Sequence, residues 1–192
     1  MNELKVLLIG GIYDLNLKPV AKYVGKEIVT RGYVLVTGAC QGSPYEAVVS
    51  ASNINGSKII GFSPAKNKEE HLSNKLNAPI EYFTKMIFHN GKFNFNNNPN
   101  LSLLERELNM IAYSDIGIML GGDTGAFSEL TTMCRVGKPI GVLTNTEHFS
   151  KLIPSVYNLG VFGNKQIIFG NDPSKLLDDL VELYQKNYNK LL

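Results

Sequence analysis

Short apolar runs alternate along the chain with longer segments whose apolar residues recur at helical spacing. The apolar runs have the length of strands and cover residues 5–9, 33–37, 58–62, 115–120, 139–143 and 166–169. The helical segments cover residues 17–31, 46–55, 101–113, 126–135 and the stretch that begins near Asp172. Because parallel strands need a long connection, usually a helix, this alternation predicts a parallel sheet. We expect an α/β fold: a single Rossmann-like, doubly wound parallel sheet with helices on both faces, in one domain over residues 1–192.

The middle of the chain is less regular. Residues 66–77 are polar and predict a loop or an irregular helix, whereas residues 80–89 mix β-branched and aromatic residues as a strand does. Five asparagines between positions 94 and 100, together with Pro99, predict an exposed loop just before the helix at 101–113.

The composition narrows the classes of partner. A net charge of +2 gives no electrostatic reason to bind nucleic acid, and no Lys/Arg run is interleaved with aromatic residues. No apolar stretch approaches the roughly 18 residues that span a bilayer, and the N-terminal residues lead directly into a strand. We therefore expect neither nucleic acid nor a membrane as partner, and a cytoplasmic location.

Few residues suggest a metal or a redox centre. Cys40 and Cys134 are the only cysteines, which is too few for a disulfide scaffold, and we expect two free thiols. Glu69, Glu70 and His71 could ligate a metal, but no second cluster has ligand spacing. We predict no metal and no cofactor. Esterase, phosphate-loop kinase and dinucleotide oxidoreductase motifs are also missing from the sequence.

The candidate chemistry centres on residues 115–130, which read as a strand, a glycine-rich turn and the start of a helix. Gly121, Gly122 and Gly125 let main-chain amides approach a ligand, and the N-terminus of the following helix favours an anion such as phosphate. Glu129 lies about one turn into that helix. Ligands of doubly wound sheets bind outside the carboxyl ends of the strands, so the loops after residues 9, 37, 62, 120 and 143 would form one site.

The glycine-rich turn resembles a motif of the Lonely Guy (LOG) nucleotide phosphoribohydrolases. Their PGGxGTxxE motif aligns without a gap on residues 121–129, and the RxxxM part of their RKxxM motif aligns on residues 106–110. Residues 37–47 and 61–71 look more like the branch grouped with molybdenum-cofactor carrier proteins, and residues 137–143 also fit. The resemblance covers roughly residues 5–145 and implies a nucleotide site of the SLOG superfamily kind.

By this resemblance, Arg106 and Glu129 would be the catalytic pair. They would hydrolyse the N-glycosidic bond of a nucleoside 5′-monophosphate to free base and ribose 5-phosphate, as a carboxylate and a guanidinium can do around an oxocarbenium-like transition state. The ligand-binding residues carried over are Gly38, Gly42, Gly121, Gly122, Asp123, Thr124 and Gly125. The resembling proteins are homo-oligomers built on helices equivalent to 101–113 and 124–137, so we expect a homo-oligomer, with a homodimer as the simplest case.

The sequence departs from the LOG motif at four positions. Gly121 replaces proline, Asp123 replaces a glycine, Ala126 replaces the phosphate-binding threonine, and Glu107 replaces lysine. Asp123 could cap the helix and occupy the amides that a phosphate would use. These changes leave open an alternative function, a non-catalytic carrier or sensor of a nucleotide or molybdopterin-type phosphorylated ligand, or a subunit whose pocket has lost its ligand.

Two residues after the first glycine-rich loop also have two interpretations each. Tyr45 could stack on a base or pack in the fold, and Glu46 could face the site or stabilise the start of its helix. The identity of the base cannot be predicted, because residues 63–100 show no motif for it.

Overall fold

The computed structural model describes residues 3–12, 15–146, 149–160, 162 and 166–188. The strands are β1 (Lys5–Ile9), β2 (Val34–Thr37), β3 (Lys58–Phe62), β4 (Lys85–Ile87), β5 (Ile116–Met119), β6 (Ile140–Leu143) and β7 (Ile167–Gly170). The helices are the 3-10 turn η1 (Leu15–Leu17), α1 (Lys18–Thr30), α2 (Ser43–Ser52), α3 (Lys68–Ser73), α4 (Pro99–Tyr113), α5 (Thr124–Arg135), α6 (Phe149–Asn158) and α7 (Pro173–Tyr188).

The strands form one sheet in the order β4-β3-β2-β1-β5-β6-β7, and every neighbouring pair is parallel. From β1 the sheet continues to β2, β3 and β4 on one side and to β5, β6 and β7 on the other. The connections on the two sides of the β1–β5 pair therefore run in opposite directions along the sheet. In such sheets this switch point opens a crevice at the carboxyl ends of the strands. The predicted doubly wound parallel sheet is confirmed.

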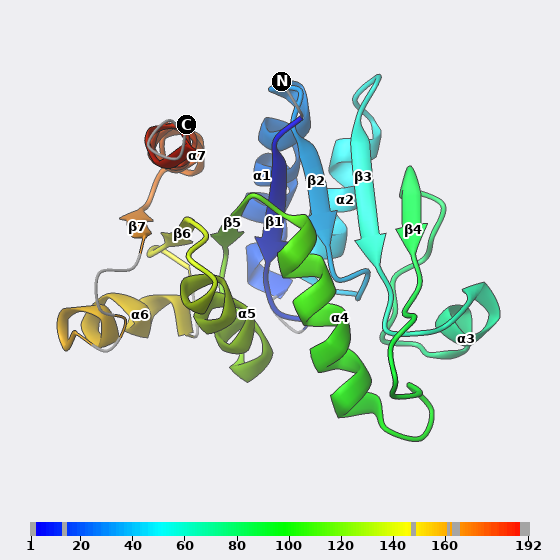
Figure 1. The fold of residues 1–192 in the computed structure, drawn as a ribbon. Helices are drawn as coiled ribbons and strands as arrows, with labels where there is room; N and C mark the ends of the chain where they lie inside the picture. Colours follow the sequence, from blue (N-terminus) through cyan, green and yellow to red (C-terminus); the bar gives the residue numbers. More distant parts are fainter. Residues whose placement is uncertain (1–2, 13–14, 147–148, 161, 163–165, 189–192) are drawn as a thin grey trace.

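Helices cover both faces of the sheet (Figure 1). Alternate residues of β1 show why: Val6 and Leu8 belong to the core cluster with α1, α2 and α7, whereas Leu7 and Ile9 belong to the cluster with α4, α5 and α6. All four side chains are almost fully buried. Burying such a side chain stabilises the fold by about 1.5–3 kcal/mol, and strands buried on both faces therefore read as continuous apolar runs.

Several predicted boundaries need correction. The strand predicted over 80–89 is confined to β4, because residues 80–83 form a turn in which the amide of Phe83 donates to the carbonyl of Ile80. Helix α2 begins at Ser43, earlier than predicted, and accommodates Pro44 in its first turn. The polar segment 66–77 contains the short helix α3. Helix α6 was not predicted.

The structure also bears on the two cysteines and on a membrane as partner. Neither Cys40 nor Cys134 forms a disulfide, as expected from the sequence. Among the described residues, no helix has the length and apolar character needed to cross a bilayer.

Candidate functional site

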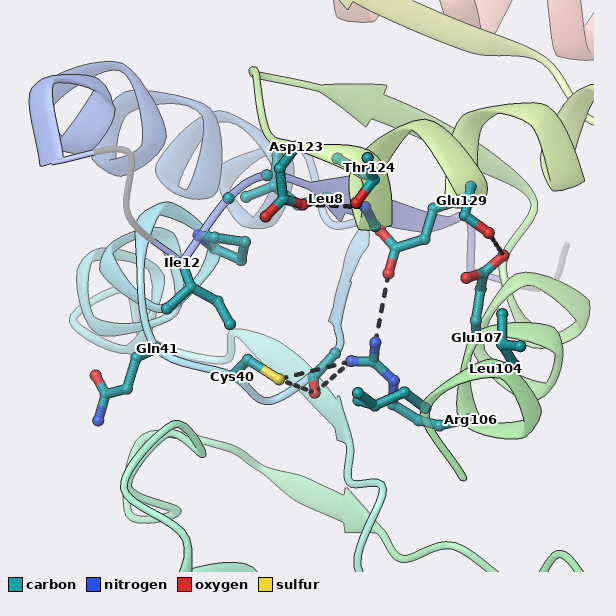
Figure 2. Close-up of a pocket in the computed structure, with 18 of the residues that line it drawn as sticks. Leu8, Ile12, Cys40, Gln41, Leu104, Arg106, Glu107, Asp123, Thr124 and Glu129 are labelled. Carbon is teal, nitrogen blue, oxygen red and sulfur yellow. Dashed lines mark hydrogen bonds and ion pairs between the residues drawn. The ribbon is translucent and has the colours of Figure 1, made fainter. Parts of the chain in front are cut away.

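A cavity of about 400 Å³ lies at the carboxyl ends of β1, β2 and β5, a size typical of small-molecule sites (Figure 2). The loop after β1 contributes Gly10, Gly11 and Ile12, and the loop after β2 contributes Gly38, Cys40 and Gln41. Further lining residues come from α4 and from the start of α5, which places the cavity at the switch point of the sheet.

At two glycines near the cavity, another side chain lies so close that a Cβ atom would not fit. A Cβ atom on Gly38 would lie 1.8 Å from Nη1 of Arg106, so the glycine leaves room for the guanidinium. Gly122 has a φ of +102°, and a Cβ there would lie 2.3 Å from Cβ of Ala126. The first glycine shapes the cavity wall, and the second lets α5 start directly behind the loop after β1.

Arg106 connects the two walls of the cavity. Its Nη1 donates to the carbonyl of Gly38 at 2.8 Å and lies 3.8 Å from Sγ of Cys40, while its Nη2 lies 3.5 Å from Oε1 of Glu129. Only 10% of the Arg106 side chain and 13% of the Glu129 side chain are exposed. The guanidinium thus links α4 to the β2 loop and to α5, and it lies between Cys40 and Glu129 in Figure 2.

Burial and neighbouring charges change the protonation of the two titratable groups beside Arg106. Burial raises the pKa of Glu129 to about 7, the charge of Arg106 opposes the rise, and the charges of Glu107 and Asp123 add to it. Burial also raises the pKa of the Cys40 thiol, although Arg106 acts in the opposite direction. Glu129 can therefore give or take a proton near neutral pH, whereas Cys40 stays a thiol.

Asp123 occupies the turn that leads into α5. Its Oδ1 accepts a hydrogen bond of 3.0 Å from the amide of Gly125, and the residue is the N-cap of the helix. The cap predicted as one role of Asp123 is present, and the amide of Gly125 already has an acceptor.

The family follows from a match between residues 4–166 and the family described as the SLOG cluster4 family. The chain belongs to this SLOG family. The resemblance identified from residues 106–129 is confirmed at the level of the SLOG superfamily. No curated protein sequence matches the chain.

Solved structures share the fold of this SLOG protein. They include the structural-genomics target TM1055, with 16% identity, coverage of 93% of this chain and 99% of that chain, and a TM-score of 0.73. The Moco carrier protein of Chlamydomonas reinhardtii has 19% identity, coverage of 96% and 99%, and a TM-score of 0.69. DNA processing protein A of Helicobacter pylori, which binds single-stranded DNA, has 21% identity, coverage of 94% and 81%, and a TM-score of 0.71. At these identities the likeness shows the fold alone.

The SLOG cavity gathers most of the residues singled out from the sequence. Those that line it are Gly38, Arg106, Asp123, Thr124, Gly125 and Glu129. Those that do not line it are Gly42, Gly121 and Gly122, which form the turns behind its wall. The loops after β3 and β6 contribute no lining residue, so the predicted gathering of five loops is reduced to those after β1, β2 and β5.

Two ambiguous residues lie outside the SLOG cavity. The ring of Tyr45 packs against Tyr82 and Phe83, with centroids 6.2 and 6.4 Å apart. Glu46 pairs with Lys18 at 2.7 Å and Lys22 at 3.4 Å, and these hydrogen bonds lower its pKa. The Tyr45 ring therefore packs in the fold and Glu46 forms ion pairs with α1, and neither side chain faces the ligand site.

The polar segment with His71 holds a loop together. His71 is fully buried, its Nε2 donates to the carbonyl of Ala78 at 2.8 Å, and its Nδ1 lies 2.7 Å from Oγ of Ser63. Since the carbonyl can only accept, Nδ1 is the acceptor for the hydroxyl. Within the described part of the chain, no group of three or more His, Cys, Asp or Glu residues could hold a metal ion.

Sequence reasoning did not assign Cys40, Ile12, Leu104 or Glu107 to the site, although all four line it. Glu107 was noticed only as a departure from the lysine of the RK pair. Its position beside Arg106 on one helix was the available signal, because a carboxylate next to a predicted site arginine changes the charge of the pocket.

Proposed function

We propose that this SLOG protein binds a nucleotide in the cavity between α4 and α5 and hydrolyses the N-glycosidic bond of a nucleoside 5′-monophosphate. Membership of the family supports a nucleotide-related binding protein. The observation that carries the catalytic part is Glu129, a nearly buried carboxyl that lies 3.5 Å from a guanidinium and whose pKa burial raises to about 7.

The proposed reaction adds one water molecule. The water oxygen bonds to the anomeric carbon as the bond from that carbon to the base nitrogen breaks, and the electron pair leaves with the base. A proton from the water ends on the departing nitrogen, giving free base and ribose 5-phosphate. Glu129 would take the proton from water and stabilise the positive charge that develops on the sugar.

Arg106 would hold the ligand rather than transfer protons. Its Nη1 is committed to the carbonyl of Gly38, but its Nε is buried and has no hydrogen-bond partner among the described residues. A buried donor of this kind is costly to leave unpaired, so we expect the Arg106 side chain to reorient and pair it with a hydroxyl or phosphate oxygen when the ligand binds.

The first experiment is incubation of the purified protein with a panel of nucleoside 5′-monophosphates, with free base followed by chromatography. We expect the parent to release base from at least one of them. Glu129→Gln should reduce the rate by about 10²–10⁴-fold, with the affinity for that nucleotide changed by no more than a few fold. Loss of binding in parallel with the rate would make Glu129 a binding residue instead.

The alternative is a carrier or sensor that binds a nucleotide or a molybdopterin-type phosphorylated ligand without turnover. It is favoured by residues 37–47, which resemble the carrier branch, and by the altered glycine motif, in which Asp123 accepts from the amide of Gly125 and would hold a nucleotide phosphate less well for hydrolysis. Thermal stabilisation of the parent by one phosphorylated ligand, without release of base, would support it. Asp123→Gly should then tighten the binding of a 5′-monophosphate, and unchanged affinity would remove this objection to phosphate.

We further propose that a second copy of the chain covers α4. Leu101, Leu104 and Leu108 form a stripe on that helix, which we call the α4 leucine stripe, and they are 42%, 48% and 56% exposed. Positions i, i+3 and i+7 lie on one helical face, and such an apolar stripe is usual at a helix-to-helix interface. Leu104 also lines the cavity, so the proposed homodimer would close the site from the side of α4.

A further inference from the structure

Glu107 is a buried carboxylate that the proposed reaction leaves unused. It follows Arg106 on α4, lines the same cavity and is only 6% exposed. A carboxylate is expensive to bury, and it is normally placed next to a cation or given several hydrogen-bond donors. Here hydroxyl groups meet that need.

The hydroxyl donors lie on both sides of Glu129 in α5. Oε1 of Glu107 accepts from Oγ of Ser128 at 3.0 Å and from Oγ1 of Thr132 at 2.9 Å. Ser128 precedes Glu129 by one residue, and Thr132 follows it by three. One carboxylate of α4 therefore holds the turn of α5 that carries Glu129. In Figure 2, Glu107 reaches this turn, while the Glu129 side chain points toward Arg106.

We propose that Glu107 is a positioning residue for Glu129, because it fixes the turn of α5 that carries Glu129 and places a second negative charge beside it. The inference rests on the proposed role of Glu129 as the proton-transfer group. It also gives a reason for a glutamate in place of the lysine of the LOG motif.

The groups that face Glu129 are Arg106 and Glu107 from α4, Asp123 from the turn before α5, and Cys40 from the β2 loop. Arg106 lowers the pKa of Glu129, whereas Glu107 and Asp123 raise it. A lysine in place of Glu107 would add a second positive charge and hold Glu129 as a carboxylate. With Glu107 present, the Glu129 carboxylate is a stronger base near neutral pH, and the proton that it takes from water can then pass to the departing nitrogen.

The test is the titration of the Glu129 carboxyl, followed by its ¹³C chemical shift in the ligand-free protein. Glu107→Gln retains an oxygen that can accept from Ser128 and Thr132 but removes the charge. We expect the midpoint of Glu129 to move to lower pH by about one unit. Glu105→Gln removes a carboxylate from the same helix, where Glu105 faces His89 and the amides of Lys92 and Phe93, and it should leave the midpoint unchanged.

Ser128→Ala distinguishes charge from packing, because it removes one hydrogen bond and leaves the carboxylate in place. An unchanged midpoint in Glu107→Gln would overturn the proposal. A midpoint that moves as far in Ser128→Ala as in Glu107→Gln would assign the effect to the hydrogen bonds that fix the turn, and would overturn the part of the proposal that rests on charge. If the glutamine variant does not fold, Glu107→Met has a similar volume but removes the charge together with the acceptor, so its midpoint is compared with that of Ser128→Ala to separate the two effects.

The outcome is separable from that of the proposed function, since the titration needs no substrate. A shifted midpoint without any release of base would support the coupling of Glu107 to Glu129 and contradict the hydrolase. Where a nucleotide is hydrolysed, the acidic limb of the kcat/KM profile should move to lower pH together with the midpoint.

Discussion

The two helical layers of this protein use polar and apolar residues in opposite ways. In the layer formed by α1, α2 and α7, the buried side chains of α1 are apolar, and charges such as Glu46 are paired near the surface. In the layer with α4 and α5, Glu107 is buried, the Arg106 and Glu129 side chains are at most 13% exposed, and three leucines face outward. The first layer follows the usual pattern of a surface helix, with apolar side chains buried and charged ones near the surface. The second layer departs from this pattern at the end that lines the cavity.

The buried charges and exposed leucines of the second layer mark a part of the fold that stability alone does not explain. Burying Arg106, Glu107 and Glu129 costs desolvation energy that an apolar core would avoid. The α4 leucine stripe exposes apolar surface, which is unfavourable in a monomer. A sequence keeps such residues where they serve binding or assembly. Helix α4 therefore carries Arg106 of the proposed catalytic pair as well as the leucine stripe of the proposed dimer.

The largest expected effect tests whether the first layer is purely structural. A Cβ on Gly25 of α1 would lie 2.4 Å from the carbonyl oxygen of Ala47 in α2, which is backbone and cannot move aside. We expect Gly25→Ala to lower the free energy of unfolding by about 3 kcal/mol. Urea denaturation measures this, with Lys26→Ala on the exposed face of α1 as the control.

Gly38→Ala is the matched change in the β2 loop, where the residue contacts Arg106 of the second layer. Its Cβ would meet the end of the flexible Arg106 side chain, so the guanidinium should move while the fold loses little stability. We expect weaker nucleotide binding with near-parental unfolding. Equal destabilisation by the two substitutions would remove the distinction between the layers.

The next effect concerns the outward-facing leucines. If a second copy covers the α4 leucine stripe, Leu108→Glu places a charge in the interface and should weaken dimerisation by a factor of about 30 or more, equivalent to roughly 2 kcal/mol. Analytical ultracentrifugation over a concentration series measures this. Leu72→Glu, at an equally exposed leucine of α3, should leave the association unchanged. A parent that stays monomeric throughout the series would contradict the dimer.

The fold was largely predictable because its signal is local. Strands buried on both faces, such as β1 and β5, read as unbroken apolar runs, and Pro173 marks the start of α7. The strand at 80–89 was overestimated, because β-branched and aromatic residues also occur in a turn beside an edge strand. Helix α6 was missed, with Pro154 inside it arguing against a helix.

The site was predictable only in part. Arg106 and Glu129 were found through motif spacing, and the structure brings them to 3.5 Å. Glu107 was overlooked although it is adjacent to Arg106, whereas Cys40 could not be assigned by spacing, since its place in the cavity depends on how the β2 loop and α4 meet in three dimensions. The catalytic roles of Arg106 and Glu129, and the extent of one domain over residues 1–192, stay predictions.

The pH dependence of stability compares one carboxylate from each layer. The pKa of Glu129 is raised from 4.5 to about 7, so the native state binds more protons than the unfolded chain between these values. The free energy of unfolding should therefore fall as pH rises from 4.5 to 7, by up to about 3 kcal/mol, and Glu129→Gln should lack this fall. The pKa of Glu46 is lowered by Lys18, so its contribution has the opposite sign. The stabilisation by Glu46 is present above its unfolded pKa and is lost as pH falls through its folded pKa, and Glu46→Gln should remove that loss.

Denaturant titrations of the parent and both variants at pH 3.5, 5.5 and 7.5 measure how the free energy of unfolding changes with pH for each carboxylate. Contributions of the same sign from Glu129 and Glu46 would show that the layers do not differ in how they hold their carboxylates.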